Sequence, residues 1–123
     1  MNILSRRAHG FVDYAMGLVL ILAPILFGFE GAARTVPMVL GFAALIYSLC
    51  TNYELGAFKL LPFRAHLTLD AMSGVLLALS PWLFGFSEQV WMPHLILGLA
   101  EIGAVVVTRT SASAEHPTTV RHS

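Results

Sequence analysis

Four long apolar stretches fill most of this 123-residue chain, at residues 10–29, 36–51, 65–86 and 91–108. A helix needs about 20 mostly apolar residues to cross the hydrocarbon core of a bilayer. Only 11% of the residues are charged, against roughly 25% in an ordinary soluble domain. The sequence therefore predicts an all-α, four-helix transmembrane bundle in contact with the lipid bilayer, and it argues against a soluble enzyme or a disordered chain.

Six of the seven basic residues fall on one side of such a bundle. They precede the first stretch, separate the second from the third and follow the fourth, whereas Arg34 falls on the opposite side. Because Lys and Arg concentrate in cytoplasmic loops, both termini are expected in the cytoplasm. The basic residues are scattered, so a nucleic-acid partner is not expected. The small, polar segment 110–123 is expected to be a disordered cytoplasmic tail, which leaves 1–109 as the membrane domain.

The chain contains an internal duplication. A shift of 57 residues aligns residues 7–52 with residues 64–109 without a gap, and 16 of the 46 pairs are identical. Apolar bias alone would not match the polar and special residues among them, which include Arg7/Arg64, His9/His66, Asp13/Asp70, Gly17/Gly74 and Pro24/Pro81. Each repeat holds two spans and so returns the chain to its starting side. The two repeats are therefore expected to be parallel, with a pseudo-two-fold axis along the membrane normal.

The third stretch ends in Ser80-Pro81-Trp82, followed by the run LFGF. Pro81 lacks an amide hydrogen and Trp82 favours the membrane interface, so the motif predicts a helix terminator rather than a ligand site. Together with the two-span repeat, the motif resembles the SPW-repeat family of small bacterial and archaeal membrane proteins, over residues 7–109. The first repeat departs from it and reads Ala23-Pro24-Ile25. The resemblance implies a fold and a location in the cell (inner) membrane, and it implies no activity.

Polar and small residues recur at helical spacing on one stripe of the first span and of the third. The stripes consist of His9, Asp13, Gly17 and Pro24, and of His66, Asp70, Gly74 and Pro81. The glycines are expected to let these two helices approach closely. The two-fold axis is expected to bring two His and two Asp together near the cytoplasmic end, unless these faces point outward toward a second chain. Three interpretations stay open for these four residues: hydrogen bonding that holds the helices together, a metal or haem site, or a proton or ion relay.

One further carboxylate, Glu101, lies within the fourth span, where the first repeat has Ala44. At 1.5 Å per residue Glu101 is about 12 Å from the inner end of its span, and Asp13 and Asp70 are about 9 Å from theirs. The three carboxylates are therefore expected to share one layer. His94 lies on the same helix face, seven residues earlier. This stripe fits a proton path to Glu101, and it equally fits a protonated Glu101 hydrogen-bonded to neighbouring backbone.

The sequence favours a structural role over catalysis. It contains no recognisable nucleophile–base pair, phosphate-binding loop or dinucleotide motif, so an enzyme is the least favoured class. Four spans with short loops also leave no soluble domain for a reaction. We therefore expect a structural or accessory membrane component, either a homo-oligomer or a subunit of a membrane complex. The competing class is a proton or ion conduit, or a metal- or haem-binding protein, built on the paired His and Asp residues and Glu101.

Overall fold

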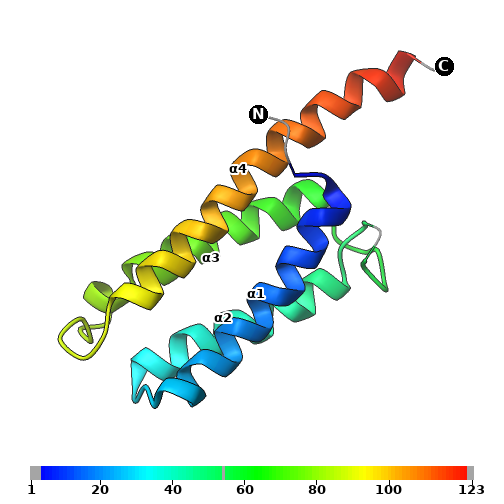
Figure 1. The fold of residues 1–123 in the computed structure, drawn as a ribbon. Coiled ribbons are helices and arrows are strands. Elements are labelled where there is room, and N and C mark those ends of the chain that lie inside the picture. Colours follow the sequence, from blue (N-terminus) through cyan, green and yellow to red (C-terminus); the bar gives the residue numbers. More distant parts are fainter. Residues whose placement is uncertain (1–3, 54, 122–123) are drawn as a thin grey trace.

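The computed structural model describes residues 4–53 and 55–121, with side chains up to Thr108, and it consists of four helices (Figure 1). These are α1 (Arg6–Phe27), α2 (Ala32–Leu49), α3 (Phe63–Leu83) and α4 (Met92–Arg121). The described part of the chain contains no β-strand, and its one isolated bridge joins Thr51 to Leu61. The predicted all-α, four-helix architecture is confirmed.

The helices form two hairpins, α1 with α2 and α3 with α4 (Figure 1). The side chain of Ser5 caps α1 by accepting a hydrogen bond from the amide of Ala8. The helix ends at Phe27 and is capped by Gly28, whose φ of 70° is the left-handed conformation that glycine adopts without strain. Since α2 begins directly after Gly31 and ends at Leu49, it starts earlier than the predicted span 36–51.

The segment 110–123, predicted to be a disordered tail, coincides with the end of α4. The described backbone remains helical as far as Arg121, and residues 122–123 lie outside the described part. The prediction of disorder rested on the composition of the segment, whose residues are mostly small and polar. However, Ala112, Ala114 and Glu115 have high helix propensity and follow a helix that is already formed.

Glycines set the spacing of the helices inside each hairpin. A Cβ atom on Gly41 of α2 would lie 2.8 Å from the carbonyl oxygen of Gly17, and one on Gly98 of α4 would lie 2.5 Å from that of Gly74. Side chains larger than hydrogen therefore do not fit at these contacts. The expectation that Gly17 and Gly74 would bring α1 against α3 is wrong, because each glycine faces the other helix of its own hairpin.

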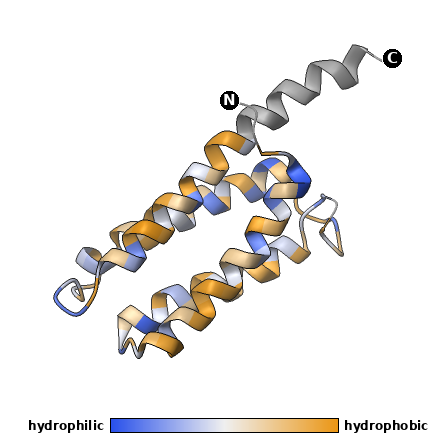
Figure 2. Cartoon of the chain, in the orientation of Figure 1, coloured by the Kyte–Doolittle hydropathy of each residue, from blue (hydrophilic) through white to orange (hydrophobic). Residues whose placement is uncertain are grey.

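Hydrophobic residues predominate along the four helices (Figure 2), and many of them lie on the outer surface of the bundle. Large apolar side chains are exposed on all four helices, among them Phe11, Leu26, Val39, Phe42, Ile46, Met72, Leu79, Leu99 and Val106. By length and composition, α1 and α2 are apolar enough to cross a membrane, and α4 contributes a shorter apolar segment, Met92–Thr108. Several polar side chains of α3 are buried instead, including His66, Asp70 and Ser73. An apolar exterior around a partly polar interior is the distribution that a membrane-embedded bundle requires.

Candidate functional site

The two predicted His and Asp pairs come together where α1 and α3 begin. His9 and Asp13 project from α1, and His66 and Asp70 project from α3; we call these four residues the His–Asp cluster. His9 Nε2 lies 3.0 Å from Asp13 Oδ1 and 2.8 Å from Asp70 Oδ2. His66 Nε2 lies 2.7 Å from Asp13 Oδ2 and 3.1 Å from Asp70 Oδ2. Each imidazole therefore faces both carboxylates, one from its own helix and one from the other hairpin.

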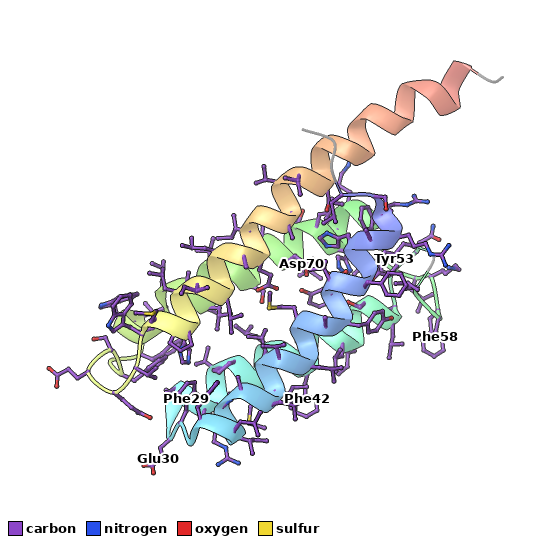
Figure 3. The ribbon with its side chains drawn as sticks, in the orientation of Figure 1. Phe29, Glu30, Phe42, Tyr53, Phe58 and Asp70 are labelled. Carbon is purple, nitrogen blue, oxygen red and sulfur yellow. The ribbon has the colours of Figure 1, made fainter. Side chains whose placement is uncertain are left out.

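Helical spacing and side-chain length together build this cluster. Within each helix, His and Asp are four residues apart, so they stand on one face a single turn apart. α1 packs mainly on α2, and α3 mainly on α4, so the backbones of α1 and α3 are not in close contact. The side chains bridge that separation, and Figure 3 shows Asp70 between α3 and α1. All four side chains are buried.

The second ring nitrogen of each histidine contacts a threonine from the opposite hairpin. His9 Nδ1 lies 2.8 Å from Thr108 Oγ1 on α4, and His66 Nδ1 lies 2.7 Å from Thr51 Oγ1 just after α2. Thr51 donates its hydroxyl hydrogen to the carbonyl oxygen of Tyr47 at 2.5 Å, so it accepts from His66. Sequence reasoning missed both threonines, although they are one of the identical pairs at the 57-residue shift.

Two tyrosines donate hydrogen bonds to the carboxylates of the cluster. The Tyr47 hydroxyl bonds Asp70 Oδ1, and the Tyr53 hydroxyl bonds Asp13 Oδ2 at 3.0 Å. Tyr53 lies in the connection between α2 and α3, and burial together with the negative charge of Asp13 raises the pKa of its phenol. It therefore stays a donor at physiological pH. These tyrosines were also missed, because Tyr47 aligns with Ala104 and Tyr53 lies outside the aligned segments.

Aromatic rings cover the cluster on the side of the α2–α3 connection. The Tyr53 ring centroid lies 5.3 Å from that of His66, and the Phe63 centroid lies 5.8 Å from His9 and 5.9 Å from His66. The ammonium group of Lys59 donates to the carbonyl oxygen of Tyr53 at 2.6 Å. Figure 3 shows Tyr53 at this end of the bundle, whereas Phe58 of the same connection points outward. These rings shield the cluster from water.

Glu101 and His94 lie on α4, and within the described residues neither side chain forms a hydrogen bond with the His–Asp cluster. Glu101 is 6% exposed, and its Oε1 has no hydrogen-bond partner within the described part of the chain. His94 lies at the opposite end of the bundle, where Nε2 donates to the carbonyl oxygen of Ala33 at 2.9 Å. Between them Gly98 packs against the backbone of Gly74. No hydrogen-bonded chain joins His94 to Glu101 among the residues described.

The SPW motif lies where α3 ends. Ser80 and Pro81 are buried, and the Ser80 hydroxyl donates to the carbonyl oxygen of Leu77 at 2.7 Å. Trp82 is 52% exposed, and its ring centroid lies 6.1 Å from that of Trp91. In the first repeat, the carbonyl oxygen of Pro24 accepts the amide of Phe29 as α1 ends. These contacts all concern helix ends, as a terminating motif requires.

The His–Asp cluster is thus the candidate site, and it offers two kinds of chemistry. Its side chains form a polar network that joins the two hairpins. One ligand atom from each of the four residues also lies within 4.8 Å of the other three, so the residues could hold one metal ion. Among the described residues around the cluster, no nucleophile lies next to a base in an open cleft.

Comparison with known proteins gives one result at the level of the family. No curated protein and no solved structure gives a match to this chain. The family profile of the SPW repeat domain matches residues 7–108, which include every residue of the His–Asp cluster and both threonines. Since that match covers most of the sequence, the chain belongs to the SPW repeat family.

Proposed function

We propose that this protein is a four-span component of a bacterial or archaeal cell membrane, with both termini in the cytoplasm and two parallel repeats. Its family, its two strongly apolar helices and its apolar exterior support the membrane location. The bias of six basic residues against one supports the orientation. The reciprocal contacts His9–Thr108 and His66–Thr51 support two equivalent repeats.

Its role is structural or accessory: the protein is a rigid membrane unit whose apolar faces pack against lipid, a second copy or another membrane protein. The observation that carries this role is the His–Asp cluster. Its buried side chains make their contacts between hairpins, through His9 to Asp70 and through His66 to Asp13 and Thr51. Polar contacts of this kind hold membrane helices together when lipid offers no alternative partner.

The test replaces both histidines and separates stability from transport. We expect His9→Ala/His66→Ala to lower the unfolding midpoint in detergent and to weaken assembly measured by size-exclusion chromatography with light scattering. Phe42→Ala, on the exposed surface, is the matched control for stability and is expected to leave the unfolding midpoint unchanged. In liposomes with a trapped pH indicator, neither wild type nor variant should carry protons. Proton flux in wild type that disappears in a normally stable double variant would contradict this role.

A second candidate function, a proton conduit, is favoured by one observation. Glu101 is buried in α4, and its Oε1 has no hydrogen-bond partner among the described residues. Ionisable side chains within a membrane are costly and often mark a proton pathway. The same liposome assay tests it with Glu101→Gln, which preserves the shape of the side chain and removes its charge. A conduit predicts flux in wild type that Glu101→Gln abolishes. A structural Glu101 predicts no flux in either protein.

A further inference from the structure

We propose that the His–Asp cluster binds one divalent first-row transition-metal ion. Its ligands are Nε2 of His9, Nε2 of His66 and one carboxylate oxygen each from Asp13 and Asp70. This goes beyond the proposed structural role, because that role requires only hydrogen bonds between the hairpins. The ligand atoms come from two turns of helix in each hairpin, so the ion would be held equally by α1 and α3.

The orientation of His66 is the observation that points to a cation. Because Thr51 donates to the Tyr47 carbonyl, it accepts from His66, so the ring hydrogen lies on Nδ1. In the neutral ring, Nε2 then presents a lone pair. This nitrogen is completely buried, lies 2.7 Å from Asp13 Oδ2, and still forms no hydrogen bond of acceptable geometry within the described residues. A lone pair directed at carboxylate oxygens requires a positive charge between them, either a proton on Nε2 or a metal ion, and Co²⁺ binding distinguishes the two.

The surroundings are those of a metal site with supporting hydrogen bonds. A histidine ligand characteristically bonds a neighbouring group through its other ring nitrogen, which fixes its orientation, and carboxylate ligands accept further hydrogen bonds. Both features occur here for every ligand. Thr108 is hydrogen-bonded to Nδ1 of His9, and Thr51 to Nδ1 of His66. Tyr47 donates a hydrogen bond to Asp70, and Tyr53 donates one to Asp13.

Size and charge also fit a single divalent ion. Metal–nitrogen and metal–oxygen bonds of about 2.1 Å place tetrahedral ligand atoms about 3.4 Å apart. The four His–Asp contacts measure 2.7 to 3.1 Å, and the widest ligand separation is within 4.8 Å, so shifts of a few tenths of an ångström to about 1.5 Å in side-chain position create the tetrahedron. Two carboxylates balance the charge of the ion, as a buried site needs.

The donor set narrows the class of metal. Two imidazole nitrogens and two carboxylate oxygens suit Zn²⁺, Fe²⁺ or Mn²⁺, and the absence of sulfur from the set disfavours Cu⁺. Four protein ligands in a buried site leave no open coordination position, which is typical of structural rather than catalytic zinc. The bound ion would therefore join the two hairpins.

The experiment uses the full chain without an affinity tag, in detergent, with both histidines of the C-terminal segment removed by His116→Ala/His122→Ala. After treatment with chelator, the protein is titrated with Co²⁺ alone. We expect about one ion per chain, with the visible d–d absorption of a tetrahedral site, and full displacement of that spectrum by Zn²⁺. A folded protein that binds neither ion overturns the proposal and leaves the hydrogen-bonded role intact.

Three variants assign the ligands. Asp13→Asn/Asp70→Asn keeps the side-chain shapes and removes both anionic ligands, and it should weaken Co²⁺ binding by more than about 100-fold. Thr108→Val removes only a supporting contact and should weaken binding by about 10- to 100-fold, so it remains informative should the first variant not fold. His94→Asn, a buried histidine far from the cluster, is the matched control and should bind as wild type does. Equal Co²⁺ affinity in wild type and Thr108→Val, or in wild type and a folded double Asn variant, overturns the assignment.

Discussion

The two hairpins are joined at both ends of the bundle, but by different kinds of contact. Where α1 and α3 begin, His9 and His66 approach two carboxylates and two threonines. At the other end, His94 makes one hydrogen bond to the Ala33 backbone, and its ring packs on Phe29 and Phe86 with centroids 5.4 and 4.9 Å away. The first set of contacts, which we call the charged joint, depends on several charged partners at once. The second set, around His94, is mostly apolar packing, and we call it the apolar joint; losing one of its contacts leaves the others in place.

The largest expected effect comes from removing one member of the charged joint. His66→Ala leaves Asp13 and Asp70 with one imidazole between them in a buried site, and breaking a buried pair in this way costs about 3–5 kcal/mol. Reversible unfolding in mixed micelles measures the free energy. Phe42→Ala on the exposed face is the control. A loss below that of His94→Ala would mean that the two joints do not differ as described.

A smaller loss is expected at the apolar joint. His94→Ala removes one buried hydrogen bond and leaves the Ala33 carbonyl oxygen without its partner, which costs about 1–3 kcal/mol. The same unfolding experiment gives the value. Since the His–Asp cluster lies at the opposite end of the bundle from His94, Co²⁺ binding should not change. A His94→Ala variant that no longer bound Co²⁺ would show that the two ends are coupled.

A double-mutant cycle sharpens the contrast between the joints. His9 and Asp70 are in direct contact, so His9→Ala and Asp70→Ala should be non-additive by about 0.5–3 kcal/mol. His9→Ala and His94→Ala lie at opposite ends and should add to within about 0.5 kcal/mol. Unfolding free energies of the singles and doubles provide both cycles. Additivity of the first pair would remove the basis for treating the cluster as one unit.

The smallest effect concerns the edge of the charged joint. Tyr53→Phe removes one hydrogen bond to Asp13 and should cost about 0.5–1.5 kcal/mol near neutral pH. Folding raises the pKa of the Tyr53 phenol, so near pH 10 the phenol ionises in the unfolded chain but stays protonated in the folded one. The stabilisation from this phenol is therefore present below about pH 10 and is lost as the pH rises further. The difference between wild type and Tyr53→Phe should therefore shrink in alkaline unfolding experiments. A difference that grows above pH 10 would have the wrong sign.

The sequence predicts the helices from the length of the apolar stretches, and it predicts the meeting of the two His and Asp pairs from the matching halves of the chain, which place equivalent faces around one axis. It does not predict which neighbour a stripe faces, so Gly17 and Gly74 were assigned to the wrong contact. Thr51 and Thr108 were detectable as an identical pair, but threonine near a helix end carries no distinctive signal. Tyr53 was out of reach, because its contact depends on how the α2–α3 connection folds back over Asp13.

The exchange of partners between the hairpins bears on how such a protein could arise. Each histidine takes its threonine from the other hairpin, His9 from Thr108 and His66 from Thr51. An isologous dimer interface has this reciprocity, since residue i of one subunit contacts j of the other and j contacts i. Two separate copies of one hairpin could make the same joint, so gene fusion would preserve it without new contacts. Tyr47 and Glu101, which align with Ala104 and Ala44 at the 57-residue shift, are positions at which the two hairpins differ.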